Sequence, residues 1–218
     1  MAILINHTTV QGTGATRTSS PVDMTGANLF VAGIIQSFSG TNVIADSQSN
    51  SWQSSGSSMV DPSFFTQGGI RYVVNPTTSS SQTFSYSGSN SNQSAVILGF
   101  RTAISFDKLN TSNSSTSSTT LTLNSFTPTA GPDLVVSLCG KVGDAGVCNS
   151  IDSGFTIGED INFIGGQQYG LTIGYKSQAT PASVGPLFTM ALAPNYLTGQ
   201  QIAFLMSSGE FSQGYIIG

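Results

Sequence analysis

Few side chains in this sequence have types and spacings suited to catalysis. His7 is the only histidine, no motif surrounds it, and no Gly-x-Ser-x-Gly nucleophile elbow is present. The adjacent acids Glu159 and Asp160 fall in a predicted strand, where neighbouring side chains point to opposite faces. They would therefore not flank one bond as the carboxylates of a glycosidase do. We predict no catalytic residue and no enzyme activity.

The two cysteines, Cys139 and Cys148, flank a glycine-rich stretch. Without a nearby histidine or further cysteine they cannot complete a tetrahedral zinc site. Two interpretations remain open. They form a disulfide across a hairpin, or they are two free thiols that pack as small apolar side chains.

Trp52 is the only tryptophan and has polar neighbours in the sequence. Exposed, it would be a platform on which a sugar ring stacks; the favoured alternative is a core tryptophan between two sheets. Asp46, Asn50 and Asp61 could offer oxygen atoms to calcium, but no loop is dense in carboxylates. We therefore predict no metal and no cofactor.

Composition limits the partners of this chain of 218 residues. Charged residues make up 7%, against about 25% in a typical soluble domain, whereas 38% are apolar and 13 are Phe. The chain should therefore fold, with a surface of Ser, Thr, Asn and Gln. The net charge is −4, and the six basic residues are scattered singly. We therefore predict that the chain binds neither nucleic acid nor an anionic membrane.

The first residues lack the basic and apolar regions of a signal peptide, and no apolar run approaches the ~20 residues of a membrane span. A surface poor in charge without an export signal has two explanations. The chain is a mature form with a new Met, or it is assembled in the cytoplasm and released by lysis.

Strand patterns recur along the chain, and no helix of ordinary length is predicted. Period-two alternation predicts half-buried strands, and nearly continuous apolar runs predict central strands. The alternating segments are residues 82–87, 120–124 and 169–175; the apolar runs are residues 29–35, 95–100, 134–138, 187–192 and 202–206; residues 3–10, 70–74 and 155–164 complete the set. Residues 1–218 are thus predicted to form one all-β domain, a jelly-roll-like antiparallel β-sandwich of roughly eleven short strands.

A weak internal repeat is visible between residues 21–31 and 128–136. In both, a turn with Pro, Gly and Asn or Asp leads into an apolar strand. It indicates either two fused copies of a half-sandwich or two similar turns before core strands. The low-complexity residues 110–119, all Ser, Thr or Asn, are predicted to be an exposed loop.

One local pattern resembles a known family. The sequence Asp46-Ser47-Gln48-Ser49-Asn50-Ser51-Trp52 follows a predicted strand, and the preceding apolar strand opens with a Gly-x-Asn-Leu turn. This resembles a β-sandwich module of tailed-bacteriophage virion proteins, including capsid decoration (cement) and fibre proteins. The resemblance covers about the first 50 residues, and Gln48-Ser49 departs from the small-Gly pair common in that turn.

The resemblance implies a non-enzymatic, multimeric particle component. We expect a decoration protein that binds itself, with a trimer favoured, and the major capsid protein. It would be assembled in the host cytoplasm and located in the virion. The apolar C-terminal residues 210–217 could pack on such a partner. The alternative is a carbohydrate- or receptor-binding module, in a tail fibre or secreted, with Trp52 as its glycan platform.

Overall fold

The computed structural model is all-β and antiparallel, as the sequence predicts. It describes residues 2–12, 14–37, 43–56, 59–61, 66–88, 93–101, 103–162 and 169–207, and these contain no helix. In this described part, no segment is a helix long and apolar enough to cross a membrane. The sandwich class is therefore confirmed; the jelly-roll detail and the single domain over residues 1–218 stay predictions.

Two large sheets form the middle of the molecule. The first has the order β1 (Ile3–Gly12), β9 (Gln93–Arg101), β3 (Leu29–Ser37), β7 (Thr66–Val74) and β5 (Gln53–Ser54), with β6 (Met59–Asp61) also paired to β7. The second has the order β10 (Ala103–Thr116), β17 (Tyr196–Met206), β12 (Asp133–Val142), β15 (Tyr169–Gln178) and β14 (Thr156–Ile161).

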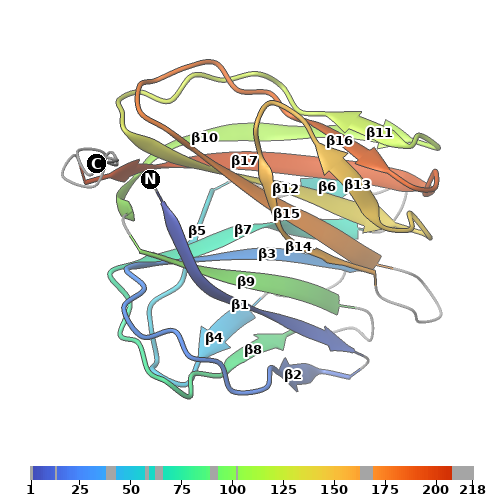
Figure 1. The fold of residues 1–218 in the computed structure, drawn as a ribbon. Helices are drawn as coiled ribbons and strands as arrows, with labels where there is room; N and C mark the ends of the chain where they lie inside the picture. Colours follow the sequence, from blue (N-terminus) through green and yellow to red (C-terminus); the bar gives the residue numbers. More distant parts are fainter. Residues whose placement is uncertain are drawn as a thin grey trace, which may run out of the picture.

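Two small sheets cover the outer faces of the large ones. β2 (Thr16–Thr18), β8 (Phe84–Ser87) and β4 (Val43–Asp46) lie over the first large sheet. β11 (Thr120–Thr122), β16 (Leu187–Met190) and β13 (Cys148–Ile151) lie over the second. Figure 1 shows the resulting stack of four layers, with the first half of the chain, apart from the short β6, below and the second half (β10–β17) above.

Three apolar cores separate these four layers. The largest lies between the two large sheets, where side chains of both halves interdigitate. The other two lie between each large sheet and its small sheet. Each half is thus a complete two-sheet sandwich, and the two sandwiches share the central core.

The two halves have the same topology. Replacing β1, β9, β3, β7 and β5 by β10, β17, β12, β15 and β14 converts one large sheet into the other, and β2-β8-β4 becomes β11-β16-β13. Only β6 has no counterpart among the described strands. The registers also correspond, because Leu29 lies opposite Phe100 in the first half as Leu134 lies opposite Phe204 in the second.

The weak sequence repeat therefore has a structural basis. Its two copies lead into β3 and β12, the central strands at equivalent positions of the two halves. The repeating unit is a whole sandwich rather than the half-sandwich that the sequence suggested.

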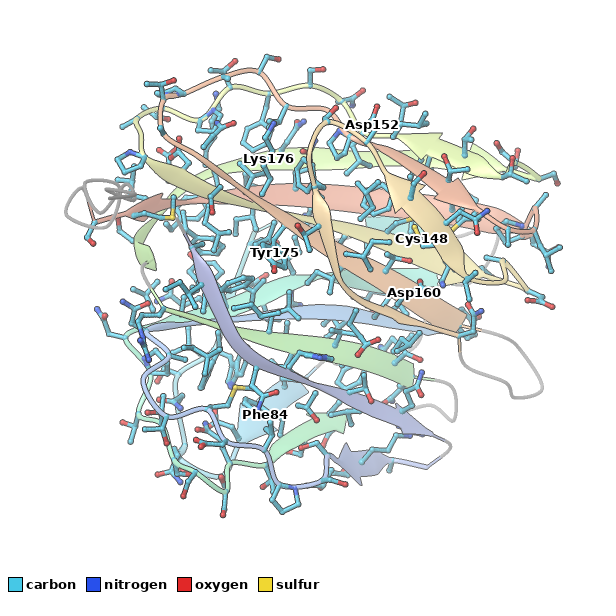
Figure 2. All side chains as sticks on the ribbon, in the orientation of Figure 1. Phe84, Cys148, Asp152, Asp160, Tyr175 and Lys176 are labelled. Atoms are coloured by element: carbon cyan, nitrogen blue, oxygen red, sulfur yellow. The ribbon has the colours of Figure 1, made fainter. Side chains whose placement is uncertain are left out.

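The contacts between the halves have two-fold symmetry. The rings of Tyr72 and Phe204 lie 5.2 Å apart at an interplanar angle of 71°, and those of Tyr175 and Phe100 have the same separation and angle. The registers make Tyr72 equivalent to Tyr175 and Phe100 equivalent to Phe204. Such reciprocal pairs are the signature of an isologous interface. In Figure 2, Tyr175 lies between the two halves.

Near the centre of this interface, equivalent positions carry residues of opposite size. A Cβ on Gly33 would meet Leu138 Cδ1 at 2.7 Å, and a Cβ on Gly140 would meet Ile35 Cδ1 at 2.7 Å. Position 33 is equivalent to 138 and position 35 to 140, from the registers of β3 and β12. Leu138 thus packs against Gly33, its own equivalent in the first half, and Ile35 packs against Gly140, its own equivalent in the second half.

Most predicted strands are present. All five apolar runs became central strands, namely β3, β9, β12, β16 and β17. The described part contains seventeen strands rather than roughly eleven. The strands that were not predicted include the short β2, β5, β6 and β13 and the 14-residue edge strand β10.

The low-complexity segment 110–119 was predicted to be an exposed loop, and the loop is wrong for residues 110–116, whereas Ser114, Thr116 and Ser117 are exposed as expected. β10 continues to Thr116, and Asn113 to Thr116 pair with residues of β17. Pairing with a buried central strand outweighs the weak strand propensity of Ser and Asn.

Candidate functional site

The Trp52 motif builds a turn at the end of β4. Trp52 is half-buried, and its ring stacks on Phe30 and meets Phe84 edge to face, with both centroid distances 6.2 Å. Its Nε1 donates to Asp46 Oδ2 at 2.8 Å. Trp52 therefore joins the core between the first large sheet and its small sheet. The Asp-x-x-x-Asn-x-Trp spacing lets the side chains of Asn50 and Trp52 both donate to Asp46.

The other oxygen of Asp46 also accepts several hydrogen bonds. Oδ1 receives them from Gln48 N at 2.9 Å, Asn50 Nδ2 at 3.0 Å and Gln82 Nε2 at 3.2 Å. Asn50 Oδ1 in turn accepts from Thr77 N at 2.7 Å. With its oxygens surrounded by protein donors, Asp46 has a structural partner set rather than that of a calcium ligand. The side chain of Asp61, the third calcium candidate, lies outside the described residues.

Both cysteines are free and buried in the structure. The disulfide, one of the two alternatives from the sequence, is thus not formed, and the thiols join the core beneath the second small sheet. Burial is the main cause that raises the pKa of both thiols. Protonated thiols are poor nucleophiles and poor metal ligands, which fits a packing role.

A buried ion pair lies beside Cys148. Lys141, at the end of β12, is fully buried, and its Nζ lies 2.7 Å from Asp160 Oδ1. Asp160 also accepts from Cys148 N at 2.9 Å and from the Thr172 hydroxyl. Figure 2 shows Cys148 and Asp160 at the same end of the second half. These three donors come from β12, β13 and β15, so the Asp160 carboxylate on β14 connects four strands through hydrogen bonds and an ion pair.

The two acids that are adjacent in sequence have different partners. Glu159 Oε2 lies 2.9 Å from His7 Nδ1, an ion pair when the imidazole is protonated. His7 is on β1 and Glu159 on β14, so this contact joins the two halves. Asp160 turns instead to Lys141. The structure thus brings the only histidine to one of the two acids but does not set both acids around a common space.

The residues that the sequence singled out therefore do not converge on one site. In the part of the chain that the structure describes, no three His, Cys, Asp or Glu side chains gather as metal ligands would. The sequence analysis missed the buried Lys141. The available signal was the position of this lysine, three residues after the end of the apolar run 134–138.

The exposed apolar side chains include three on edge strands of the large sheets, and Ile157 of β14, at the opposite edge from β10, is 36% exposed. Ile3 of β1 is 46% exposed and Phe106 of β10 is 41% exposed. Others lie away from those edges, among them Val147, which is 60% exposed in the turn before β13. A single exposed apolar residue is ordinary, but β1 and β10 are also equivalent strands of the two halves.

Comparison with known proteins gives no further guide. No family model, no curated protein and no solved structure matches this chain.

Proposed function

We propose that this chain is a non-enzymatic structural protein of a virus particle, a capsid decoration (cement) protein of a tailed bacteriophage. It acts as a homo-oligomer, with a trimer expected, bound to the major capsid protein. The edges of the two large sheets are the observation that supports this proposal most. Capsid attachment itself rests on the family resemblance of the Asp46–Trp52 turn.

Each large sheet ends on a long edge strand. β1 has 10 residues and β10 has 14, and among the described residues no strand pairs with their outer sides. An exposed edge offers a row of unpaired backbone groups to another chain, and monomeric proteins usually block it with charged side chains. β10 carries Asp107 and Lys108, which bond to Thr129 N and Thr127 O, but β1 carries no Lys, Arg, Asp or Glu. Such an edge suits pairing between chains by strand addition.

The duplication gives one chain two equivalent edges, β1 and β10. Two attachment edges on one rigid body make binding bivalent, and bivalence raises avidity without strong single contacts. A protein that holds a lattice together needs this property more than it needs a deep pocket. The apolar C-terminal residues 210–217, a further candidate contact from the sequence, lie outside the described residues.

The carbohydrate-binding alternative has less geometric support. It requires Trp52 to offer its ring face to solvent, whereas that ring packs on Phe30 and Phe84 and its Nε1 is bonded to Asp46.

Particle association tests the proposal. Particles purified on a density gradient from a lysed culture that produces the protein should carry it in a fixed ratio to the major capsid protein. The protein should also rebind to particles from which it has been stripped. Recovery of the protein only at the top of the gradient, with no rebinding, would contradict the proposal.

A further inference from the structure

A group of buried oxygen atoms without hydrogen-bond donors lies at the start of β12. Asp133 is fully buried, and neither of its carboxylate oxygens has a partner. Gln178 lies opposite it on β15 and is 8% exposed. The Gln178 amide donates from Nε2 to Ala182 O at 3.3 Å, but its Oε1 accepts nothing. None of these three acceptor oxygens makes a hydrogen bond within normal geometry, although the Gln178 amide is close enough to lower the pKa of Asp133.

Other shielded carboxylates of this protein are satisfied. Asp46 and Asp160 each receive hydrogen bonds on both oxygens, and Asp160 also has the ammonium group of Lys141. An ionised carboxylate without such partners is costly to bury. Asp133 therefore needs a positively charged or proton-donating partner that the described residues do not supply.

The charge around Asp133 points the same way. Burial, and then the negative charge of Asp107 on β10, raise the pKa of Asp133 to about 6. Asp107 Oδ2 accepts from Thr129 N at 2.8 Å. The nearby cation Lys108 donates instead to Thr127 O at 2.8 Å. Asp133 is thus within the electrostatic influence of a second carboxylate, and no Lys or Arg side chain among the described residues forms an ion pair with it.

The first half of the chain provides an internal comparison. The register makes Asn28 equivalent to Asp133, since Leu29 and Leu134 follow them at matching positions. Asn75, whose N donates to Asn28 O, occupies the place of Gln178. The same corner of the fold is therefore neutral in one half and acidic in the other, so the architecture does not require the carboxylate.

We propose that Asp133 and Gln178, with Asp107 alongside, bind a divalent cation that prefers oxygen ligands, Ca²⁺ above all. Carboxylate and amide oxygens are the ligands that Ca²⁺ takes in proteins, and water completes its coordination. No thiol or imidazole belongs to this group, so the donor set does not suit zinc. Residues 129–131 and 179–183, the chain neighbours of Asp133 and Gln178, are exposed, so the group lies next to the protein surface along the chain.

Equilibrium dialysis of the full chain with Ca²⁺, after treatment with a chelator, tests this site directly. We expect one Ca²⁺ per chain at neutral pH. The folding equilibrium constant, measured by urea unfolding, should rise about 100-fold when free Ca²⁺ is 100 times the dissociation constant.

Asp133→Asn is the deciding variant. It should lose both the binding and the Ca²⁺-dependent stabilisation. It should still fold in chelator, because the new amide can donate to Gln178 Oε1 and Asn28 already stands in the equivalent place. Asp144→Asn is the matched control: Asp144 is exposed, it accepts from Gly146 N, and the variant should bind as the unaltered chain does.

Two results would overturn the proposal. One is the absence of any Ca²⁺ or Mg²⁺ effect on the unaltered chain, which would mean that Asp133 carries a proton. The other is equal binding by the Asp133→Asn variant, which would place the ion elsewhere. Both results leave the role in a virus particle untouched, because the site does not depend on it.

Discussion

Asp46 organises one corner of the molecule through a single carboxylate. Trp52, Asn50 and Gln82 all donate a side-chain hydrogen to it, so removing it leaves three donors unsatisfied at once. Asp46→Ala should lower the free energy of unfolding by about 2–4 kcal/mol, measured by urea unfolding followed through Trp52 fluorescence.

Asp23→Ala is the control for this substitution. Asp23 is exposed and accepts from Thr25 N at 2.9 Å in a local turn, and its loss should change stability little. Equal effects of the two substitutions would show that the Asp46 network does not stabilise the fold.

The cysteines give a second prediction at this scale. Because both thiols are buried and protonated, neither should react with a thiol reagent in the folded protein, and both should react after unfolding without a reductant. Alkylation followed by intact-mass measurement counts them. A protein that exposes no thiol after unfolding would contain the disulfide that the structure lacks.

Single residues were predictable from sequence to different degrees. The Asp46–Trp52 spacing was visible, and a core Trp52 was the favoured interpretation. The sequence analysis did not identify Lys141 and Asp133 as buried charged residues. A strand pattern predicts on which face of the sheet a side chain lies, but it does not predict which side chains of other strands surround it. The contact of His7 with Glu159 joins residues far apart in the chain and had no local signal.

At the scale of elements, the complementary pairs between β3 and β12 make a quantitative prediction. Gly33→Ala should destabilise by about 1–3 kcal/mol because its Cβ would crowd Leu138. Leu138→Ala should cost about 2–5 kcal/mol through the cavity that it leaves. In the double variant each change relieves the other, so its cost should fall below the sum by about 1 kcal/mol or more in urea unfolding.

The matched control combines Gly33→Ala with Ile151→Ala. Ile151 packs in the core beneath the second small sheet, away from Gly33, and those two costs should add. Additivity in the Gly33–Leu138 pair as well would contradict direct packing between the halves.

Strands were predictable where their burial was extreme. The five apolar runs became central strands; four of them lie in the large sheets, whose two faces are covered by other layers, whereas β16 of a small sheet buries one face only. β10 was missed entirely: residues 103–109 were not among the predicted strands, and the Ser, Thr and Asn residues that follow are as typical of a loop as of an edge strand. The edge position of β10 is set by β17, which lies about 90 residues later in the chain.

At the scale of the whole molecule, the chain is a covalent pair of equivalent sandwiches. Its two-fold symmetry follows from topology, register and ring contacts together, whereas the sequence showed one weak repeat. Equivalent positions that face each other across the interface carry residues of different size, such as Gly33 and Leu138, and these differences hide the repeat in the sequence. The symmetry also places β1 and β10 at equivalent edges, where a second copy can pair with either.

The solution mass of the full chain tests this self-association most directly. Light scattering after size exclusion, at low micromolar concentration, should give a stable oligomer, with a trimer expected. Ile3→Lys and Phe106→Lys add charge to the two edges and should reduce that mass, whereas Val147→Lys, away from both edges, should leave it unchanged. A monomer at every concentration, or an oligomer that neither edge variant weakens, would contradict the account.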